Sequence, residues 1–504
     1  MYREKLNRAS RHHPTLSALC AGGLLGIGFV FPALWWLYLP GAIVFLQVIR
    51  RAPSLYRALF YGAVAMTVKA AVAMVCFWSI VPIAWMDVGG LFAQILATGL
   101  YWTTFSVWIG LGGVVLGGVV YLLREYWWWY FVVIPMWLVS EILGSLSFSF
   151  FTGAPNIPIT IDYGVGYIGY HVAQHAVLFH GAAWGGVYVL SLLAASLAVL
   201  CYYLWTVRSH HTLYLAGGLV VFILIGYIPN SGAWLAPPAV SVDPVRIAVV
   251  GTNVPASLER EQDIFGQRQY QITRALMGVV GQSVTHVVLP EDVRFMPSER
   301  APFSAHSFLR QLFRDEPVML IDSARYQLDD GLYTLRGRIY QNDSEDIWHV
   351  DKQYLVPQGE YIPVLYATIF RALGYGEAVA GLQEKLGYVP GPYRDQSGLP
   401  DTAPRTIFCF ESVSPRGVRT ALAGSEQVPF VYHPLSHARF NNARICWRSL
   451  DTMLRIQARW NQVPIVSSAN RAPSNVYYPD GSIRTLIDHW DNDNDMVRVK
   501  VFDL

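Results

Sequence analysis

Charged residues are scarce in this chain of 504 residues, where Asp, Glu, Lys and Arg make up only 14% and hydrophobic residues make up 53%. The shortage is greatest in the first half, where Lys69, Arg124 and Arg208 are the only basic residues between Arg57 and Pro229. About a quarter of the residues of an ordinary soluble domain are charged, so this composition excludes a single domain of that kind. We expect no nucleic-acid partner.

Cysteine is also rare, and the five residues of the chain are Cys20, Cys76, Cys201, Cys409 and Cys446. The first three lie in apolar segments, which leaves Cys409 and Cys446 as the one pair in the second half. Two cysteines in an exported domain can form a disulfide. Such a bridge would silence Cys409 as a nucleophile, and we therefore expect both thiols to be free.

Several well-known site motifs are missing. The chain has no G-x-S-x-G segment and no P-loop. His433 and His437 are spaced like metal ligands, but Pro434 argues against a helix there and no third ligand is evident. We expect the two histidines to have a surface or supporting role. The acidic run 491–495 lacks the Gly and Glu that a calcium loop needs. We therefore expect neither a metal nor another cofactor.

Long apolar runs dominate the first half. About seven of them have the length that a membrane crossing needs, roughly 17–25 residues. They cover residues 15–31, 33–49, 57–80, 91–122, 129–149, 182–206 and 212–229. The fourth run is too long for one straight crossing, so it must tilt or continue along the interface. This pattern predicts a multi-pass helical membrane domain over residues 1–230 and a Pro-rich linker over residues 231–244.

Basic residues occur on alternate loops of this domain. The N-terminus and the loop between the second and third runs carry Arg3, Lys5, Arg8, Arg11, Arg50, Arg51 and Arg57. The loops around Asp87 and over residues 152–180 carry none. Because basic loops stay in the cytoplasm, this bias predicts a cytoplasmic N-terminus. Seven crossings then place residues 245–504 outside, which in a bacterium is the periplasmic side of the inner membrane.

The second half shows the pattern of a mixed α/β domain. Short β-branched runs predict strands at 245–250, 286–289, 318–321, 332–340, 348–350, 406–410, 429–432 and 464–468. Helical patterns cover residues 258–280, 305–314 and 443–460, and a Pro-Asp-Gly turn predicts a hairpin over 475–484. Alternating strands and helices with hairpins predict a layered α/β sandwich over residues 245–504.

Three residues in this domain have the chemistry of acyl transfer. Cys409 is a nucleophile if a base takes its proton, and Glu291 is the candidate base. Lys352 supplies a fixed cation that can stabilise an oxyanion. Glu360 can orient Lys352 or the incoming nucleophile, and Glu411 follows Cys409 on what we predict to be the same strand face. Each residue alone is most often structural, so the prediction depends on their joint occurrence.

Two ionisable residues fall inside predicted spans. Glu141 lies near the outer end of the fifth span, and Lys69 lies in the third. Burying such groups in a membrane is costly, so each is a candidate functional residue. For Glu141, a structural role as a hydrogen-bond anchor is an equal alternative. The sequence does not identify a partner for Lys69.

The order Glu291, Lys352, Cys409 resembles that of the nitrilase superfamily, and nearly the whole chain resembles its membrane-bound branch, apolipoprotein N-acyltransferase. The segments that carry the resemblance are 289–291, 352–363 and 409–411, together with 137–155 and 186–191 in the membrane half. The resemblance implies an αββα sandwich with Glu291, Lys352 and Cys409 as its catalytic triad. Residues 431–440 replace the family's Thr-Asn-Asp-x-Trp-Phe-Gly stretch, and residues 496–504, a strand-like tail, stand where the family has a last membrane helix.

The resemblance also implies a two-step reaction at the membrane. Cys409 takes an acyl chain from a phospholipid as a thioester, and the α-amine of a diacylglyceryl-cysteine apolipoprotein then accepts it. The expected partners are phospholipid, lipoprotein and membrane lipids, and the expected state is a monomer. Two alternatives stay open. One is a membrane-tethered amidase or an acyltransferase with another acceptor, as in homologues linked to conjugal transfer. The other is a catalytically silent scaffold.

Overall fold

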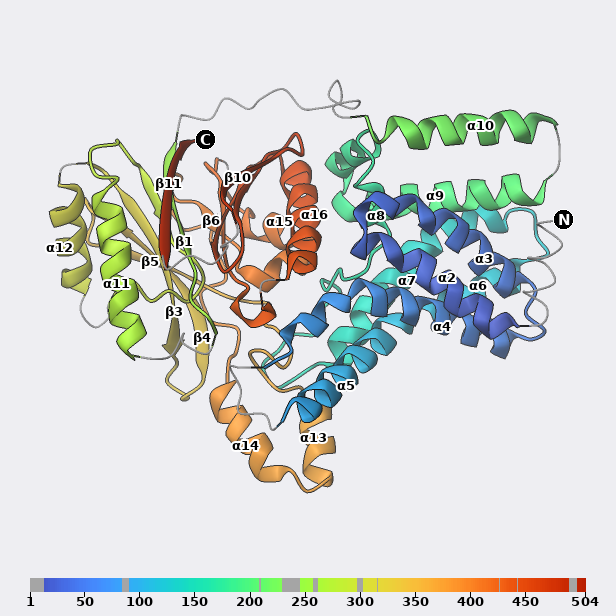
Figure 1. The fold of residues 1–504 in the computed structure, drawn as a ribbon, viewed down its shortest axis with the longest axis horizontal. Helices are drawn as coiled ribbons and strands as arrows, with labels where there is room; N and C mark the ends of the chain where they lie inside the picture. The colour runs from blue at the N-terminus through green and yellow to red at the C-terminus, as the bar shows by residue number, and fades with distance from the viewer. Residues whose placement is uncertain are drawn as a thin grey trace. The chain divides into compact units, whose positions relative to one another are not determined.

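The computed structural model describes residues 13–83, 90–207, 210–228, 245–256, 262–296, 302–314, 316–425, 427–441, 443–488 and 496–504. The chain divides into two compact units (Figure 1). The helical unit consists of Met1–Trp78, Ile95–Phe151 and Ile159–Ala236. The sandwich unit consists of Ser79–Gln94, Thr152–Pro158 and Pro237–Leu504, so it includes two short segments from the first half of the sequence.

Apolar helices make up most of the first half of the chain. They are α2 (Pro14–Val30), η1 (Pro32–Leu37), α3 (Tyr38–Arg50), α4 (Leu55–Ala73), η2 (Val75–Ile80), α5 (Leu91–Gly110), α6 (Gly112–Leu123), α7 (Trp129–Phe151), α8 (Gly169–Val172), η3 (Leu178–Trp184), α9 (Gly186–Thr206) and α10 (His210–Ile225). Each of the seven predicted runs coincides with one or two of these helices.

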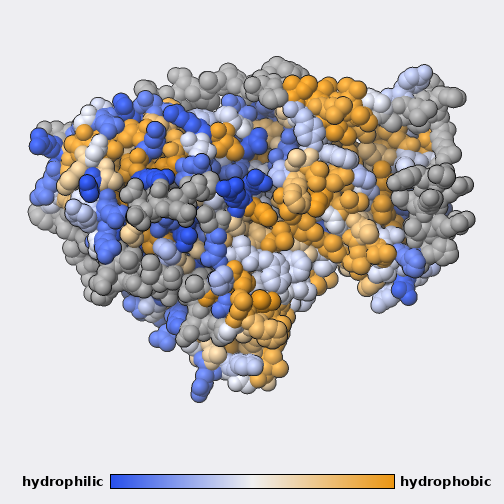
Figure 2. All heavy atoms as spheres, viewed as in Figure 1, coloured by the Kyte–Doolittle hydropathy of each residue, from blue (hydrophilic) through white to orange (hydrophobic). Residues whose placement is uncertain are grey.

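Five described segments are long and apolar enough to cross a membrane, namely Pro32–Arg50, Leu55–Ala73, Leu91–Leu123, Trp129–Phe151 and Gly186–Thr206. Helix α2, with 17 residues, is apolar but shorter. On the face drawn in Figure 2, hydrophobic side chains cover much of the helical unit. These lengths and this surface are typical of a multi-pass membrane protein.

Small residues let the helices of this unit approach closely. A Cβ atom added at Gly62 of α4 would collide with the backbone carbonyl of Gly113 on α6, and one added at Gly113 would collide with that of Gly62. Across the α6–α7 contact, the Ser140 hydroxyl donates a hydrogen bond of 2.8 Å to the Gly112 carbonyl. Close backbone approach and side-chain hydrogen bonds are the usual means of helix association in membranes, where water supplies no hydrophobic driving force.

The sandwich unit contains all the described strands and the remaining helices. In chain order its elements are β1 (Arg246–Thr252), α11 (Gln262–Met277), β2 (His286–Val288), α12 (Pro302–Phe313), β3 (Met319–Gln327), β4 (Tyr333–Gln341), β5 (Ile347–Asp351), α13 (Val364–Ala372), α14 (Gly376–Lys385), β6 (Arg405–Thr406), η5 (Cys409–Val413), α15 (Gly417–Ala421), β7 (Val431–Ser436), η6 (Ala438–Phe440), α16 (Arg444–Asn461), β8 (Ile465–Asn470), β9 (Ser474–Tyr477), β10 (Ile483–Ile487) and β11 (Val497–Asp503).

The strands form two connected layers. In the first, the order is β11-β1-β2-β3-β4-β5, with β1, β2 and β3 parallel. In the second, β6, β7 and β8 are parallel, and β9 and β10 continue antiparallel. The layers join where Thr252 of β1 pairs with Asn470 of β8, and the Thr252 hydroxyl lies 3.0 Å from the Asn470 side-chain oxygen.

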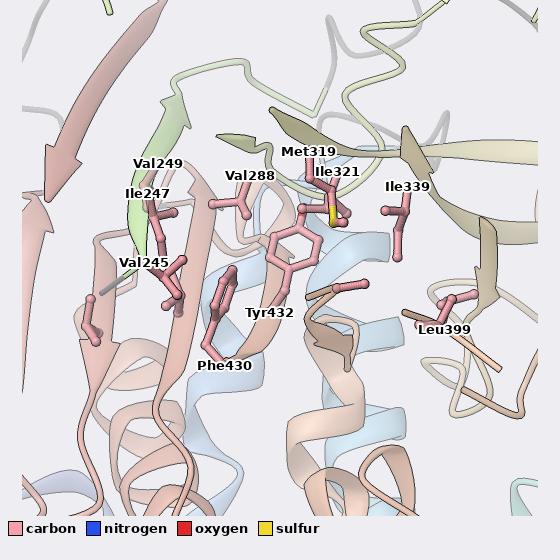
Figure 3. Close-up of a cluster of buried hydrophobic side chains, with 14 of the residues drawn as sticks. Val245, Ile247, Val249, Val288, Met319, Ile321, Ile339, Leu399, Phe430 and Tyr432 are labelled. Atoms are coloured by element: carbon pink, nitrogen blue, oxygen red, sulfur yellow. The ribbon is translucent and has the colours of Figure 1, made fainter. Parts of the chain in front are cut away.

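Alternation along the strands shows how the layers stack. Val249 of β1 and Tyr432 of β7 belong to one buried cluster between the two layers, part of which is drawn in Figure 3. The next residue of β1, Val250, instead packs with α11 and α12, and Val431 of β7 packs with α15 and α16. Successive side chains of a strand point to opposite faces, so the order is helices, sheet, sheet, helices. The predicted αββα sandwich is confirmed.

Two local predictions were wrong or incomplete. The strand predicted over 406–410 ends at Thr406, and a short 3-10 helix begins at Cys409. Two helices, α13 and α14, lie in a stretch for which we predicted no element. The tail 496–504, which we expected to be strand-like, does form a strand, β11, antiparallel to β1.

Candidate active site

Lys352 is the centre of a buried charge cluster in the sandwich unit. It directly follows β5, and its backbone N–H donates to the Leu335 carbonyl at 2.9 Å, which fixes its place beside β4. Its Nζ lies 2.9 Å from Glu291 Oε1 and 2.7 Å from Glu360 Oε1. The side chain is only 1% exposed. The structure thus brings three of the predicted site residues into direct contact.

The loop after β2 positions Glu291. The Leu289 N–H donates to the Ile321 carbonyl of β3 at 3.2 Å, so the register of β2 and β3 continues to the edge of the sheet. Asp292 follows with φ = 54°, and its N–H donates to the Ser323 hydroxyl at 2.9 Å. The carboxylate of Asp292 also pairs with Arg294 at 2.7 Å. Glu291 is therefore held between anchored neighbours at the carboxyl end of a parallel strand.

A tight loop positions Glu360. The Glu360 N–H donates to the Val356 carbonyl, and the Val356 N–H donates back to Glu360 Oε2 at 2.8 Å. Gln358 takes a positive φ of 63° in this turn. Arg439 closes the loop from outside by donating to the Gly359 carbonyl at 2.7 Å. One carboxylate oxygen of Glu360 thus holds its own loop, and the other holds Lys352.

Cys409 occupies the first position of η5, and its Sγ lies 4.0 Å from the Ser436 carbonyl oxygen. The charges of Glu291, Lys352 and Glu360 all act on its thiol. Burial raises the pKa of Cys409 far above its usual value, Glu291 raises it further, and Lys352 opposes this shift. The raised pKa favours the neutral form of the Cys409 thiol. Cys409 and Cys446 are not joined by a disulfide, as we expected.

The pKa shifts of Glu291 and Lys352 explain how the Cys409 thiol can lose its proton. Burial raises the pKa of Glu291 above its usual value, Lys352 lowers it, and Glu360 raises it. Burial alone would lower the pKa of Lys352, but Glu291, Glu360 and Cys409 together raise it well above 10.5. Lys352 therefore stays charged. Glu291 is a stronger base than an exposed carboxylate because its raised pKa favours proton uptake.

Glu411 connects the two loops of the site. It lies in η5, and its Oε1 accepts hydrogen bonds from the backbone N–H groups of Gln353 at 2.6 Å and Tyr354 at 3.2 Å. Its Oε2 accepts from the Phe408 N–H at 2.6 Å. Burial raises the pKa of Glu411 to about 7, although these N–H groups oppose the shift. Glu411 thus joins the residues beside Lys352 and Cys409, and our prediction of a strand there was wrong.

The two histidines of the replaced segment are buried, so a surface role for them is wrong. His433 lies in β7 and is fully buried, and His437 follows this strand with 6% exposure. His433 contacts the backbone carbonyl of Cys409, which agrees with the alternative of a supporting role. No group of three or more potential metal-binding side chains occurs among the described residues.

Glu141, the candidate in the membrane half, lies in α7 and pairs with Lys69 of α4 at 2.7 Å, each side chain being 3% exposed. Its Oε1 also accepts from the Ile168 N–H at 2.7 Å, and its Oε2 accepts from the Ser191 hydroxyl at 2.8 Å. The pair therefore connects α4, α7, α9 and the segment before α8. The partner of Lys69 could not be identified from the sequence because 72 residues separate the two.

Comparisons with known proteins find similarity among solved structures only. No protein-family description matches the sequence, and no curated protein matches it. Three similar structures are of an amidase from Nesterenkonia sp. AN1. A cysteine-to-alanine mutant described as belonging to the nitrilase superfamily is 17% identical, with 54% of this chain and 93% of that chain covered and a TM-score of 0.34.

The second is described as an amidase from Nesterenkonia sp. and is also 17% identical, with 54% and 92% covered and a TM-score of 0.33. The third is a mutant showing covalent addition of the acetamide moiety of fluoroacetamide at the active-site cysteine, with 17% identity, 53% and 92% covered and a TM-score of 0.33.

Proposed function

We propose that this protein is a membrane-bound acyltransferase of the carbon-nitrogen hydrolase type that moves an acyl chain from a phospholipid to the N-terminal amine of a diacylglyceryl-cysteine apolipoprotein. The observation that carries the proposal is the buried cluster of Lys352 with Glu291 and Glu360, whose charges act on the Cys409 thiol. Apolar helices in the same chain support a lipid-anchored donor and acceptor.

In the first step, Glu291 takes the proton from the Cys409 thiol as sulfur attacks the ester carbonyl of the phospholipid. This transfer moves a negative charge from one buried group to the other, so the net charge of the cluster does not change. It therefore avoids the cost of burying an extra charge, which would oppose a free thiolate at rest. The Lys352 ammonium stabilises the negative oxygen of the tetrahedral intermediate.

The intermediate then collapses to a thioester. The carbon–oxygen bond of the ester breaks, and the leaving alkoxide of the lysophospholipid takes the proton from Glu291. Glu291 is a carboxylate again, and Cys409 carries the acyl chain. A raised pKa suits Glu291 to this exchange because it must accept a proton and then return it. Glu360 keeps Lys352 in place during both transfers.

In the second step, the amine of the apolipoprotein attacks the thioester carbonyl. Glu291 accepts a proton from the attacking nitrogen, the carbon–sulfur bond breaks, and the sulfur takes that proton. The products are an amide and the free Cys409 thiol. If water replaces the amine, the same acyl-enzyme yields a carboxylic acid, which is the amidase-type alternative.

The proposed setting is the bacterial inner membrane, with the sandwich unit in the periplasm and the protein a monomer. The support for this orientation is the Lys and Arg bias of the loops in the sequence. A periplasm-specific reporter fused after Leu504 is expected to be active. Activity of a cytoplasm-specific reporter at the same position would contradict the orientation.

The function is tested by giving the purified full-length protein phospholipid vesicles together with a diacylglyceryl-cysteine peptide. The expected product is the N-acylated peptide, and a peptide with a blocked α-amine is the matched control. Release of free fatty acid at the same rate with either peptide would favour the hydrolytic alternative. Growth of a bacterial strain depleted of its apolipoprotein N-acyltransferase, restored by this chain, is the corresponding result in cells.

A further inference from the structure

His433 makes two hydrogen bonds that join β8 to Cys409, the first residue of η5. Its side chain is 0% exposed. Nδ1 lies 2.8 Å from the Ser467 hydroxyl, on the residue directly opposite in the parallel pairing of β7 and β8. Nε2 lies 3.2 Å from the backbone carbonyl oxygen of Cys409. The ring therefore bridges a strand of the sheet and the first residue of η5.

The chemistry of the partners fixes the proton on this ring. A carbonyl oxygen only accepts, so Nε2 carries the proton and donates to Cys409. Nδ1 then accepts from the Ser467 hydroxyl. Burial lowers the pKa of His433 to about 4, the hydrogen bond to Cys409 opposes the shift, and the charge of Lys352 adds to it. The imidazole is therefore neutral and adds no charge to the cluster.

This arrangement excludes His433 as the base. Both ring nitrogens are already engaged, one with a carbonyl and one with a hydroxyl, so neither is left to accept the thiol proton. The carbonyl of Cys409 accepts a second hydrogen bond, of 2.6 Å, from the Ser412 hydroxyl. Two donors thus fix the orientation of the peptide group that carries the nucleophile.

We infer that His433 is a positioning residue for the Cys409 nucleophile. It holds the Cys409 carbonyl against β7 and β8 and thereby directs Sγ toward Glu291 and Lys352. The identity of the substrate that this thiol attacks depends on the proposed function, but the positioning role of His433 does not. A displacement of about 1 Å at a reacting atom can cost on the order of 10²-fold in rate. Loss of the hydrogen bond to the Cys409 carbonyl should therefore lower the reaction rate much more than the affinity for the donor.

Two amide variants of His433 test whether its role is to position Cys409 or only to fill the space between the strands. In His433→Gln the side-chain amide reaches the place of Nε2 and can still donate to the Cys409 carbonyl. In His433→Asn the amide reaches only the place of Nδ1, beside Ser467. Both variants are made in the full-length protein in lipid nanodiscs. Two rates are measured by mass spectrometry of the Cys409 peptide: alkylation by iodoacetamide and single-turnover acylation by phospholipid.

We expect His433→Gln to stay within about threefold of the unmodified protein and His433→Asn to acylate on the order of 10²-fold more slowly at saturating phospholipid. Alkylation should fall by about tenfold in His433→Asn, because transfer of the thiol proton to Glu291 depends on the place of Sγ. His437→Gln is the matched control, since His437 is also buried and its backbone N–H is bonded to the Asn470 carbonyl. It should be near normal in both rates.

Equal rates for His433→Gln and His433→Asn, whether both normal or both slow, would overturn the inference. If His433→Asn does not fold, Ser467→Ala replaces it. This change removes only the partner of Nδ1, and slowing to a rate between those of the unmodified protein and Cys409→Ser supports the inference, while an unchanged rate overturns it. If alkylation separates the two His433 variants but phospholipid acylates no form of the protein, positioning stands and the proposed function fails.

Discussion

Two buried lysines, one in each unit, pair with a glutamate at 2.7 Å, yet their surroundings differ in a way that separates a structural pair from the proposed catalytic cluster. Lys69 pairs with one carboxylate, so the charges of Lys69 and Glu141 balance. The other hydrogen bonds of Glu141 go to the Ile168 N–H and the Ser191 hydroxyl. Every contact holds a helix or a loop in place.

The Lys352 cluster has one carboxylate more than it needs for charge balance. Glu291 and Glu360 share one ammonium, and the Cys409 thiol lies within their electrostatic influence. Burial, together with the negative charge of Glu360, keeps the pKa of Glu291 above its usual value, although Lys352 opposes the shift. An extra buried charge does not help a structural pair. It does help a base that must receive a proton, because it raises the pKa of that base. This difference predicts how variants of the two clusters will behave.

Cys409→Ser is expected to have the largest effect. A serine hydroxyl is a far poorer nucleophile beside a carboxylate base, so acyl transfer should fall by at least about 10³-fold. The measurement is N-acylation of the diacylglyceryl-cysteine peptide. Cys446→Ser is the matched control, because Cys446 is buried in α16 and its Sγ contacts the Ser79 hydroxyl at 3.9 Å. Loss of activity in Cys446→Ser with retention in Cys409→Ser would reverse the assignment.

Glu291→Gln and Lys352→Met should each slow single-turnover acylation of Cys409 by about 10²-fold. The first removes the proton acceptor but keeps the shape, and the second removes the charge that stabilises the oxyanion. The double variant should be little slower than either single one, because the groups act as a unit. Near-normal rates in a folded single variant would mean that this cluster is as structural as the Lys69 pair.

Lys69→Met and Glu141→Gln should show the opposite pattern, with a loss of stability and little change in chemistry. Removing one partner of a buried pair leaves the other uncompensated, which costs about 3–5 kcal/mol, and removing both should recover part of this loss. Thermal unfolding in detergent, followed by tryptophan fluorescence, measures the effect. A loss of acylation of tenfold or more in protein that is still folded would show a catalytic role for the membrane pair.

The smallest effect is expected from the ionisation of Glu411, which should change the acylation rate by a few-fold with pH. Its pKa of about 7 lies above the ordinary 4.5, so the neutral form is favoured in the fold. Its contribution to stability is therefore present at low pH and is lost as pH rises from about 4.5 to 7. Activity should change in the other direction, because the ionised carboxylate holds the Gln353 and Phe408 N–H groups more strongly.

The check on this pH prediction is a comparison of acylation rates across pH 5–8 in the unmodified protein and in Glu411→Gln. In Glu411→Gln the acylation rate should no longer rise around pH 7, while the pH dependence that is due to Glu291 should stay. Superimposable profiles would show that ionisation of Glu411 does not matter for the rate.

The sequence predicted the elements that long patterns define. The apolar runs of the first half gave helices whose ends differ by a few residues from the prediction, as for 129–149 against Trp129–Phe151. The strands around β1, β4 and β8 were also found, because buried strands need β-branched residues over several positions. The αββα class follows from their order and from the resemblance.

The elements that the sequence could not give depend on contacts between distant residues. Cys409 was placed in a strand because Ile407 and Phe408 are apolar, but a capping pattern at Glu411 begins a helix there instead. The burial of His433 results from Ser467 and Cys409, which no local pattern reveals. The contacts of Lys352 with Glu291 and Glu360, and their electrostatic effect on Cys409, were expected only from residue types in order, and the catalytic roles of these residues are still proposals.

The central claim is that the Lys352 cluster serves a covalent reaction at Cys409, and the most direct test is to look for the intermediate. The full-length protein is incubated with phospholipid vesicles without an amine acceptor, and its peptides are then analysed by mass spectrometry. We predict one acyl chain on the Cys409 peptide, removed by hydroxylamine and missing in Cys409→Ala. An acyl group on Cys446 or another residue instead, or no hydroxylamine-labile adduct on the folded protein, would contradict the account.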